Sequence, residues 1–577
     1  MCGIFALLNY QPMTSDDIKN QFLKGHRRGP EFSKLDFSYF KMVLGFHRLA
    51  INGLNKESNQ PLVFNDIILI CNGEIYNYKE LYKSMNVKPT TDSDCEVIIH
   101  LFIRYGIEQT LNMLDGVFSF VLYDNRISHD LSNKLYVARD PYGVRPLYCL
   151  TGLNKNYNHF VGIASELKCL VDFYSKAHPE YTISQFTPGT FTEYESSSKV
   201  NSLWLSLREN VKYFVPTFSH NFPSINNSNN SNNSTIFKDY FEEIYKNVSQ
   251  NLLSVVHKRC LTTERPIACL LSGGLDSSLI TALVNEFYKK QNYNILLETY
   301  SIGLKGSEDL KYASIVADYL GTKHTEIIVT EKDMVDIIPE LIYTIESYDT
   351  TTIRASIGNY LLGKYISKNS QAKVIFNGDG SDELFGGYLY MNKCPDDIEF
   401  DKETRRLLTD IHLFDVLRSD KSISSNGLEP RTPFLDKSFV NYYLSIPPYF
   451  RNHKNFNKCE KFILRNSFNK IYFSNNEGKQ ILPDEVLWRK KEAFSDGVSM
   501  LNRSLYQILQ EHSSQKLKLS EGKDFPVNIE TEKYYYKKLF DNYYPNCENI
   551  IPYFWMPKYT DATDPSARTL TFYEEKV

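Results

Sequence analysis

A cysteine stands directly behind the initiator methionine, in the stretch MCGIFALL. Alone it could be one more buried packing thiol. Removal of Met1, however, gives Cys2 a free α-amino group beside its thiol. With a reference pKa of about 7.8, against about 10.4 for lysine, that amine offers roughly 400-fold more free base at neutral pH. It can take the thiol proton directly or through water, so we predict that Cys2 is a nucleophile activated without a nearby histidine.

Four further residues fit a pocket for a free α-amino acid. Asn72 and Gly73 end an apolar run in CNGEIYN, where an amide side chain and a backbone N–H can stabilise a tetrahedral oxyanion. Arg48 in FHRLAI suits a carboxylate, and Asp94 in TTDSDCEV suits an ammonium group. Singly, Arg48 also fits a surface ion pair and Asp94 a helix N-cap. Together they predict an amino-acid site beside Cys2.

A second site is predicted at LLSGGLDSS, which follows an apolar run and precedes a helical one. Gly273 and Gly274 let backbone N–H groups converge, and Ser272 and Ser277 add hydroxyl donors, so the stretch forms an anion nest at a helix N-terminus. The alternative is a plain glycine-rich turn. The lysine of a Walker loop is missing, which disfavours γ-phosphoryl transfer. We therefore predict binding of pyrophosphate or a nucleotide phosphate.

A third stretch, FNGDGSDELFGGY, places three acidic residues among glycines at the end of another predicted strand. They are Asp379, Asp382 and Glu383. Clustered carboxylate oxygens suit Mg²⁺ and the chemistry of phosphates. An acidic turn without function is the alternative.

The elements around these residues predict two domains. Residues 1–210 carry short β-type runs and two helical stretches, near 14–26 and from Asp94, which indicates an α+β domain with a strand at its start. Residues 211–235 include NFPSINNSNNSNNS and are predicted to be a disordered linker or loop. Residues 236–577 begin with strands and helices in alternation, typical of a parallel α/β sheet with ligands at the strand ends, and continue as a mostly helical part.

Composition narrows the class of protein. The chain has 577 residues, 42% of them hydrophobic, and a formal net charge of -4, which gives no electrostatic footprint for nucleic acid. No stretch approaches the ~18 apolar residues of a membrane helix. The 10 cysteines contain no C-x-x-C pair and are typical of reduced thiols. We therefore predict a cytoplasmic protein without nucleic-acid or membrane partners.

The first half resembles a known family. The stretches MCGIF, GPE, HRLAI, NQPL, CNGEIYN, DSDCEV and GVFSFVLYD resemble the class II glutamine amidotransferase domain, an N-terminal-nucleophile fold with an αββα sandwich. The resemblance implies that the mature N-terminal cysteine attacks the glutamine amide, releases ammonia and forms a γ-glutamyl thioester that water hydrolyses. It implies a glutamine site made of Arg48, Leu49, Ala50, Ile51, Asn52, Asn72, Gly73, Glu74 and Asp94.

Within that site the resemblance implies individual roles. Arg48 holds the α-carboxylate of glutamine, Asp94 its amino group, and Asn72 with Gly73 the oxyanion, while Glu74 lines the pocket. One stretch departs from the family. The usual R-H-R-G-P-D appears here as GHRRGPE, with His26 and Arg27 interchanged in type and Glu31 in place of aspartate.

The second half resembles the synthetase domain of glutamine-hydrolysing asparagine synthetases, of the ATP-pyrophosphatase type. The matching stretches are LLSGGLDSS, YSIGLKGSEDLKYA, IESYDTTTIRAS, GDGSDELFGGYLYMNKCP, GLEPRTPFLDK, KCEKFILR, RKKEAFSDGVS and DPSARTL. The resemblance implies that the β-carboxylate of aspartate attacks ATP to give β-aspartyl-AMP and pyrophosphate, and that ammonia then displaces AMP. A homodimer is the family expectation.

The same resemblance implies a set of site residues. The ATP set is Leu270, Ser272, Gly273, Gly274, Asp276, Ser277, Ile302, Asn377 and Gly378. The set for aspartate and the intermediate is Thr351, Thr352, Arg354, Asp379 and Lys461, and the Mg²⁺ ligands are Asp276 and Asp382. Where the family usually has S-G-E-G-S-D-E, this chain has NGDGSDE, so Asp379 replaces a glutamate tied to the acyl-adenylate and is one methylene shorter.

Two other functions stay open at this point. One is a related amidotransferase that adenylates another carboxylate, as in β-lactam synthetase-like proteins, although those relatives generally lack the cysteine. The other is a regulatory protein with a glutaminase fold and no synthetase activity, which the intact SGGLDSS loop disfavours.

Overall fold

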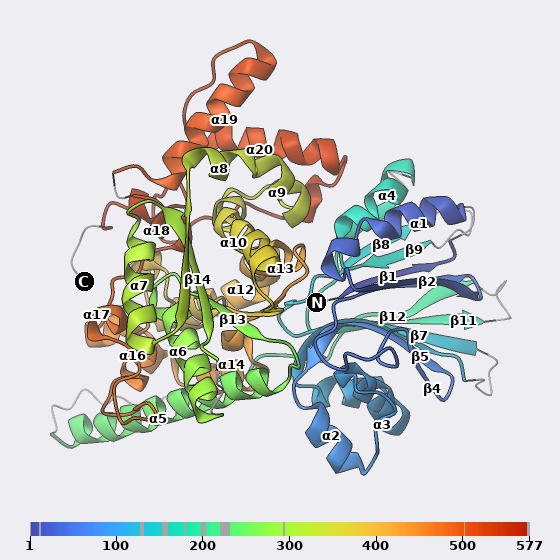
Figure 1. The fold of residues 1–577 in the computed structure, drawn as a ribbon, viewed down its shortest axis with the longest axis horizontal. Coiled ribbons are helices and arrows are strands. Elements are labelled where there is room, and N and C mark those ends of the chain that lie inside the picture. The colour runs from blue at the N-terminus through green and yellow to red at the C-terminus, as the bar shows by residue number, and fades with distance from the viewer. Residues whose placement is uncertain are drawn as a thin grey trace.

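The computed structural model describes residues 2–10, 13–126, 132–152, 160–177, 181–197, 203–219, 231–291, 295–500 and 502–573. Residues up to Lys212 form two antiparallel sheets with strand orders β10-β8-β9-β1-β3-β2 and β12-β11-β7-β6-β5-β4 (Figure 1). The first sheet consists of β1 (Gly3–Leu8), β2 (Phe32–Tyr39), β3 (Met42–Arg48), β8 (Tyr148–Gly152), β9 (Val161–Ala164) and β10 (Tyr181–Gln185). The second consists of β4 (Leu62–Phe64), β5 (Ile67–Ile75), β6 (Gly116–Asp124), β7 (Ser132–Arg139), β11 (Thr190–Ser197) and β12 (Trp204–Lys212).

Helices cover the outer faces of both sheets, so this domain has a helix–sheet–sheet–helix layering (Figure 1). The helices are α1 (Ser15–Leu23), α2 (Tyr78–Met85), α3 (Val97–Met113) and α4 (Val171–Ala177). The two-residue period of a strand decides which side chains face which layer. In β1, the even-numbered Ile4, Ala6 and Leu8 lie in the core between the sheets, whereas Phe5 and Leu7 pack with α1 and α4. The predicted α+β domain with a strand at its start is thus observed.

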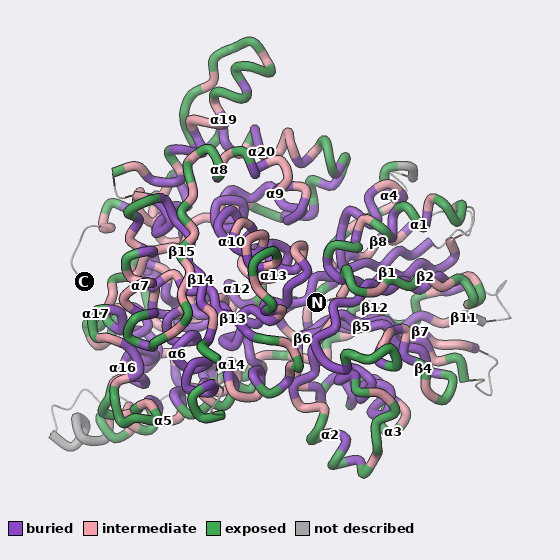
Figure 2. Tube along the Cα trace, viewed as in Figure 1, coloured by how far each residue is buried: buried purple, intermediate pink, exposed green. Residues whose placement is uncertain are grey.

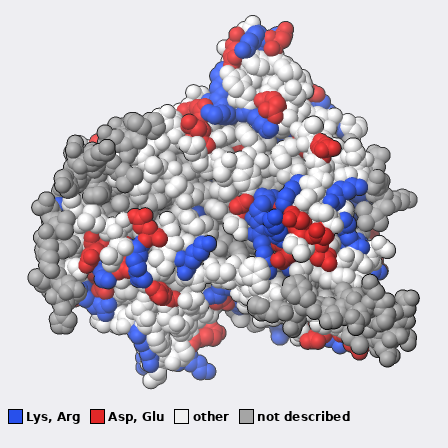
Figure 3. Space-filling model, turned by 180° about the vertical axis from the view of Figure 1, so that it is seen from behind, with Lys and Arg blue, Asp and Glu red and all other residues white. Residues whose placement is uncertain are grey.

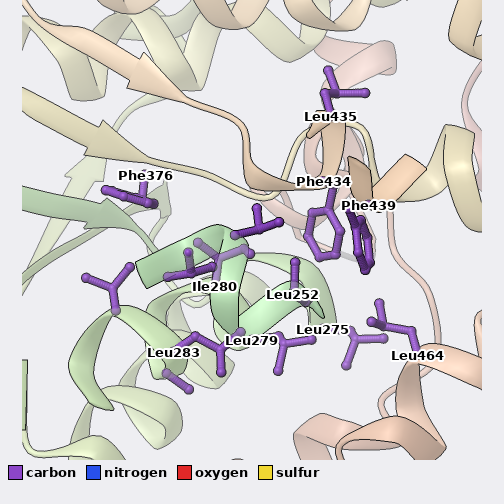
Figure 4. Packing of buried hydrophobic residues seen from close by; sticks show 14 of the residues in the cluster. Leu252, Leu275, Leu279, Ile280, Leu283, Phe376, Phe434, Leu435, Phe439 and Leu464 are labelled. Atoms are coloured by element: carbon purple, nitrogen blue, oxygen red, sulfur yellow. The ribbon is translucent and has the colours of Figure 1, made fainter. Parts of the chain in front are cut away.

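The second domain is built on a parallel sheet of strand order β15-β14-β13-β16-β17. Its strands are β13 (Ile267–Leu270), β14 (Glu298–Leu304), β15 (Lys323–Val329), β16 (Val374–Phe376) and β17 (Glu429–Arg431). Alternation again sorts the side chains, because Cys269 and Phe376 face α6 (Leu275–Lys290) and α7 (Glu308–Leu320), as Figure 4 shows for Phe376 and the α6 leucines. On the other face, Leu270 and Ile302 pack with α10 (Thr350–Asn369) and α13 (Asp415–Ser424).

Helices dominate the rest of the chain, as predicted for the part beyond about residue 384. A long helix, α5 (Ser231–Leu261), leads into the parallel sheet, and α19 with α20 forms a projection at the top of Figure 1. The others are α8 (Glu331–Asp336), α9 (Ile338–Ile345), α11 (Ser381–Phe385), α12 (Asp397–Asp410), α14 (Lys437–Ser445), α15 (Pro448–Arg451), α16 (Phe462–Ser467), α17 (Asp484–Leu487), α18 (Phe494–Gly497), α19 (Leu505–Glu521) and α20 (Ile529–Tyr543).

The segment predicted as a linker, residues 211–235, is bounded by regular structure on both sides. Strand β12 ends at Lys212 and α5 begins at Ser231, while residues 220–230 of the Asn-rich tract lie outside the described residues. The end of the predicted linker is therefore helical. Once a helix is nucleated, adding a residue to it costs little free energy. The packed part of α5 can therefore stabilise the helical conformation of its polar first turns.

The two domains share buried surfaces, which Figure 2 shows as continuous burial from one to the other. Leu49, Ile51 and Tyr76 of the first domain belong to the same apolar cluster as α5 and α6. Among the described residues, no helix is both long and apolar enough to span a membrane. All ten cysteines are free thiols.

Charged side chains are also buried where the domains meet. Arg28 binds Glu166 of its own domain and Asp420 of α13, each with Nη1 to oxygen at 2.7 Å. Lys421, the next residue of α13, binds Glu166 at 3.4 Å and also contacts Glu346. These side chains are almost fully excluded from solvent. The interface thus combines apolar packing with buried ion pairs.

Candidate functional site

Cys2 and Asn72 meet between the two sheets because both continue the even-numbered series of their strands. Cys2 precedes β1 and packs on the core between the sheets, and Asn72 follows Ile68 and Ile70 in β5. The backbone N–H of Cys2 donates to Asn72 Oδ1 at 3.1 Å. The Asn72 Nδ2 atom is buried without a hydrogen-bond partner among the described residues, so it is available to an added acceptor.

Cys2 lies in a pocket that brings together most of the residues predicted for the amino-acid site. Besides Cys2, its predicted lining residues are Arg48, Leu49, Ile51, Asn52, Gly73, Glu74 and Asp94. The Cys2 Sγ atom lies 3.8 Å from the carbonyl oxygen of Leu49, and the Arg28 Nε atom donates to the Cys2 carbonyl at 2.9 Å. Ala50 does not line the pocket; its backbone N–H and C=O bond outward, to Glu31 and Arg265. Below we refer to this space as the Cys2 pocket.

Gly73 has a steric reason to be glycine. A Cβ atom built there would lie 2.7 Å from the Val117 carbonyl oxygen and 2.8 Å from Phe118 Cβ in the paired strand β6. Any other side chain would push β5 away from β6. The glycine therefore keeps the backbone beside Cys2 close to the neighbouring strand.

The charged groups of the pocket are buried. Arg48 donates through Nη1 to the Asn55 carbonyl at 2.9 Å and to Asn59 Oδ1 at 2.6 Å, which fixes its guanidinium against the loop that follows β3. Asp94 Oδ2 accepts from the Ile75 N–H at 2.7 Å. Burial raises the pKa of Asp94 to about 6. Burial also raises the pKa of Glu74 well above its ordinary value, and the nearby Asp94 adds to that shift.

Burial raises the pKa of the Cys2 thiol as well. Because the thiolate is the nucleophilic form, the thiol needs a base close by to react at neutral pH. The Cys2 nitrogen is held beside the thiol by its hydrogen bond to Asn72 Oδ1, which makes this nitrogen the candidate base in place of a histidine.

A second cavity lies at the carboxyl ends of β13, β14 and β16, as the alternating pattern predicted. The predicted residues that line it are Leu270, Ser272, Gly274, Asp276, Ser277, Ile302, Thr351, Asn377, Gly378, Asp379, Asp382 and Lys461. We refer to it as the Asp276 cavity. The Gly274 backbone precedes α6 as its N-cap, and Ser272 and Ser277 share a hydrogen bond of 3.0 Å between their hydroxyls. Hydroxyls and a helix N-terminus thus face one space, which suits an anion.

Two glycines permit the close approach of backbone around the Asp276 cavity. Gly273 has φ +73°, and a Cβ atom there would lie 2.4 Å from Ala313 N. A Cβ atom on Gly378 would lie 2.8 Å from Asp276 Cβ and from Ser277 N. Gly273 does not line the cavity itself; its contribution is to allow the tight turn that precedes α6.

Lys461 joins the acidic side chains of the cavity. Its Nζ atom lies 2.6 Å from Asp276 Oδ2 and 2.7 Å from Asp382 Oδ1. Lys491 Nζ binds the other oxygen of Asp382 at 2.6 Å. Burial opposes ionisation of Asp382, but the two ammonium groups outweigh it and hold the pKa of Asp382 well below its ordinary range. The carboxylates of Asp276 and Asp382 therefore converge on one ammonium group.

Asp379 lies on the wall of this cavity. Its Oδ1 atom is 3.4 Å from Arg418 Nη2, and Arg418 also binds Asp415 Oδ1 at 2.5 Å. Burial raises the pKa of Asp379 and the Arg418 charge offsets part of that increase. The carboxylate thus sits beside a fixed cation on α13.

Comparison with known proteins agrees with both halves of this description. The family model described as a glutamine amidotransferase domain matches residues 1–214, and that of asparagine synthase matches residues 248–399 and 393–562. The chain is 38% identical to human (Homo sapiens) asparagine synthetase [glutamine-hydrolyzing] over 593 residues, with 100% of both chains covered. It is 38% identical to the chicken (Gallus gallus) protein of the same name over 595 residues, again with 100% of both covered.

The chain belongs to the family of glutamine-hydrolysing asparagine synthetases. A similarity to the solved structure of NMN synthetase from Francisella tularensis, with a TM-score of 0.24 and 11% identity over 54% of this chain and 98% of that one, is too distant to bear on the fold.

Two residues predicted for the synthetase half lie away from the Asp276 cavity. Thr352 lies in the first turn of α10, where its Oγ1 and its N–H both donate at 2.8 Å to Oδ2 of Asp349, the N-cap residue of that helix. Arg354 points into a buried ion-pair cluster: it binds Glu532 through Nη2 at 2.6 Å and Asp564 through Nη1 at 2.7 Å. The α10 residues that line the cavity, Thr351, Ala355 and Asn359, follow one another at intervals of four and so share one face of the helix. Thr352 and Arg354 lie to either side of that face, so one motif serves both the cavity and the core.

Several lining residues were missed by sequence reasoning. Glu429 of β17 belongs to the second domain yet lines the Cys2 pocket. Asp415, Arg418 and Lys491 line the Asp276 cavity. Lys491 lies in the stretch RKKEAFSDGVS and Glu429 in GLEPRTPFLDK, so the resemblance covered both residues. Nothing in the local sequence, however, marks Glu429 as a neighbour of Cys2.

Asp94 should make glutamine binding by this synthetase pH-dependent. Its pKa of about 6 means that the carboxylate is protonated below that pH and cannot pair with the ammonium group of the ligand. We expect the glutamine Kd of a Cys2→Ala variant, measured by calorimetry, to rise about tenfold for each pH unit below 6. A Kd that stays constant from pH 7 to pH 5 would contradict this role.

Arg354 should act on stability rather than on chemistry. Arg354→Met leaves two buried carboxylates, Glu532 and Asp564, without the cation that pairs with both, so we expect a loss of about 3–5 kcal/mol in the free energy of unfolding, measured with urea. The matched control is Arg503→Met, whose partially exposed pairs with Glu331 and Glu511 should be worth at most about 1 kcal/mol. Lost activity with unchanged stability would place Arg354 at the reaction instead.

Proposed function

We propose that the chain makes L-asparagine from L-aspartate and ATP, with ammonia released from L-glutamine. One observation carries this proposal. Strands β16 and β17 are parallel neighbours, paired at Phe376 and Arg431. Strand β17 contributes Glu429 to the Cys2 pocket. Asn377 and Gly378, which follow β16, line the Asp276 cavity. A pocket suited to a glutaminase and a cavity suited to ATP are thus connected through one pair of strands.

In the glutaminase half, we take the first domain to be an N-terminal-nucleophile fold that becomes active when Met1 is removed. The nitrogen of Cys2 then becomes the base for its own thiol, and Asn72 already accepts from it at 3.1 Å. Thiolate attack on the glutamine amide carbon gives a tetrahedral oxyanion, for which Asn72 Nδ2 and the Gly73 N–H are the donors. Collapse expels ammonia and leaves a γ-glutamyl thioester, which water hydrolyses to glutamate.

The roles of the charged residues follow from their placement. Arg48 pairs with the α-carboxylate of glutamine and Asp94 with its ammonium group, while Glu74 and Asn52 bond each other at the wall. Removing either charge loses a charge-assisted hydrogen bond, worth about 1.5–3 kcal/mol.

In the synthetase half, the β-carboxylate of aspartate attacks the α-phosphorus of ATP, and pyrophosphate leaves. Ser272, Ser277 and the N-terminus of α6 receive the departing phosphates. Lys461 and Lys491 offset the charge that develops on them. Ammonia then attacks the acyl carbon of β-aspartyl-AMP, and AMP carries away the bonding electrons.

Mg²⁺ fits this cavity as a partner of the phosphates. The Asp276 and Asp382 carboxylates converge on one ammonium group, and oxygen ligands of this kind suit Mg²⁺, which usually binds one or two carboxylates together with phosphate and water. Among the described residues, no group of three or more His, Cys, Asp or Glu side chains forms a metal site without such help. When bound, the ion neutralises charge on the leaving pyrophosphate.

Ammonia released at Cys2 would be protonated in open water, so we propose a sheltered passage along β17. Glu429 and Arg431 bind each other there at 2.9 Å, and Arg431 reaches Glu74 of the Cys2 pocket at 3.4 Å. Burial alone would raise the pKa of Glu429, but the Arg431 charge outweighs it and lowers that pKa to about 2. The pair is therefore ionic and fixed.

Location and assembly remain predictions. We propose a cytoplasmic enzyme that forms a homodimer and has only small-molecule substrates. On the face seen in Figure 3, acidic and basic residues lie beside one another, as expected of a solvated surface rather than a phosphate-binding one.

Ammonium should rescue a variant without the nucleophile. Cys2→Ala removes glutamine-dependent asparagine formation but leaves the Asp276 cavity intact, so we expect synthesis from added ammonium chloride at a rate similar to that of the unaltered chain. The measurement is asparagine, AMP and pyrophosphate formed from aspartate and MgATP. A folded Cys2→Ala protein that ammonium cannot rescue would rule out the two-site mechanism.

A longer carboxylate at position 379 should be tolerated. Asp379→Glu keeps the charge beside Arg418 and adds one methylene, so we expect ammonia-dependent synthesis to be preserved or raised. Asp379→Asn keeps the size of the side chain but removes the charge next to Arg418, and it should lower kcat by about tenfold or more, because a charge-assisted contact is worth about 1.5–3 kcal/mol. Complete loss of activity in Asp379→Glu would refute an equivalent role for the two carboxylates.

A further inference from the structure

The loop that shapes the Cys2 pocket is bonded to the second domain. Loop 48–53 begins at Arg48, the last residue of β3. The Arg48 guanidinium donates to the Asn55 carbonyl, and the Leu49 carbonyl lies 3.8 Å from the Cys2 thiol. Residues 262–265 connect α5 to β13 and lie against this loop. We call residues 262–265 the clamp segment.

Arg265 and Glu31 together hold the backbone of Ala50 through its C=O and its N–H. Arg265 Nε donates to the Ala50 carbonyl at 2.8 Å, and the Ala50 N–H donates to Glu31 Oε2 at 2.7 Å. The other oxygen of Glu31 accepts from Arg265 Nη2 at 2.8 Å. The two charged side chains and the backbone N–H and C=O of Ala50 therefore form a closed ring of three hydrogen bonds that crosses from one domain to the other.

The rest of the clamp segment bonds the next three residues of the loop. The Glu264 N–H donates to the Ile51 carbonyl at 3.0 Å, and Glu264 Oε1 accepts from the Gly53 N–H at 2.8 Å. Asn52 Nδ2 donates to the Thr262 carbonyl at 3.2 Å. Each residue from Ala50 to Gly53 is thus fixed by the second domain through at least one hydrogen bond.

We propose that the clamp segment positions loop 48–53 for glutamine, with Arg265 and Glu31 as its main positioning residues. This inference rests on the proposed function. It gives a role to Glu31, one of the residues at which GHRRGPE departs from the family pattern. The same segment leads directly into β13 and the loop that begins at Ser272, so the glutamine pocket and the ATP cavity are anchored to the two ends of one short stretch.

The consequence is a separation of kinetic effects. Neither Arg265 nor Glu31 lines either pocket, so loss of the clamp should leave both chemistries intact and weaken only the placement of Arg48 and Leu49. A residue that acts by placing the substrate-binding loop changes the KM for glutamine. It should not change the ammonia-dependent reaction, which bypasses the Cys2 pocket.

The experiment measures the KM for glutamine and the kcat of ammonia-dependent synthesis on the full-length chain with its mature N-terminus. Arg265→Ala should raise the KM for glutamine about tenfold and leave ammonia-dependent kcat within twofold. Arg265→Lys should fall between, because one ammonium group cannot reproduce the two-pronged contact of the guanidinium. Glu31→Gln should also raise the KM, since its amide nitrogen must face one of two N–H donors.

A double variant and a matched control complete the test. The double variant Arg265→Ala, Glu31→Gln should have a KM for glutamine no higher than that of the single variant with the higher KM, because both substitutions break the same ring. Arg27→Ala is the control: Arg27 pairs with Glu340 across the same interface at 3.4 Å without touching loop 48–53, so its KM should be unchanged.

Two outcomes would overturn the clamp. One is an unchanged KM for glutamine in Arg265→Ala, and the other is an equal loss of glutamine-dependent and ammonia-dependent activity, which would indicate a merely structural role. Failure of the proposed function would look different, since the unaltered chain would then form no asparagine from aspartate, MgATP and ammonium.

Discussion

The contact between the two domains is the constraint on which both sites depend. It buries ion pairs such as Arg28 with Glu166 and Asp420, whose charges have lost their water. A buried pair gives little net stability, but a buried charge without its partner costs about 3–5 kcal/mol. The domains can therefore meet in one arrangement only. That arrangement is also the one in which Glu429 of the second domain completes the Cys2 pocket of the first.

Within the first domain, the register of two strands determines the position of the nucleophile. Cys2 and Asn72 carry even numbers in strands whose even-numbered side chains fill the core between the sheets. A shift of one residue in either strand would turn its polar end away from the other. The buried leucines and isoleucines that fix the register thus also hold the Cys2 nitrogen within 3.1 Å of Asn72 Oδ1.

Sequence patterns predicted the features that are determined by residues close together along the chain. The strand containing Asn72, the glycine turn at Gly273 and the helix after it all follow from neighbours along the chain, and the structure contains them. Contacts between distant segments have no such signal. Glu429 reaches Cys2 only through the domain contact, and Arg354 turns from the cavity because Glu532 and Asp564 meet it from far along the chain.

Helix α13 shows how closely the two halves are joined. Its residue Arg418 lies 3.4 Å from Asp379, and Ser419 accepts from Asn377 at 2.6 Å on the side of the Asp276 cavity. The next residue, Asp420, binds Arg28, which in turn donates to the carbonyl oxygen of Cys2 at 2.9 Å. Three consecutive residues of one helix therefore link both sites, Arg418 and Ser419 by direct contact with the cavity residues and Asp420 through Arg28. A helix moves as a rigid unit over so short a span, so a displacement of α13 at the Asp276 cavity must also displace Asp420, the partner of Arg28. The Cys2 pocket and the Asp276 cavity therefore cannot be repositioned independently.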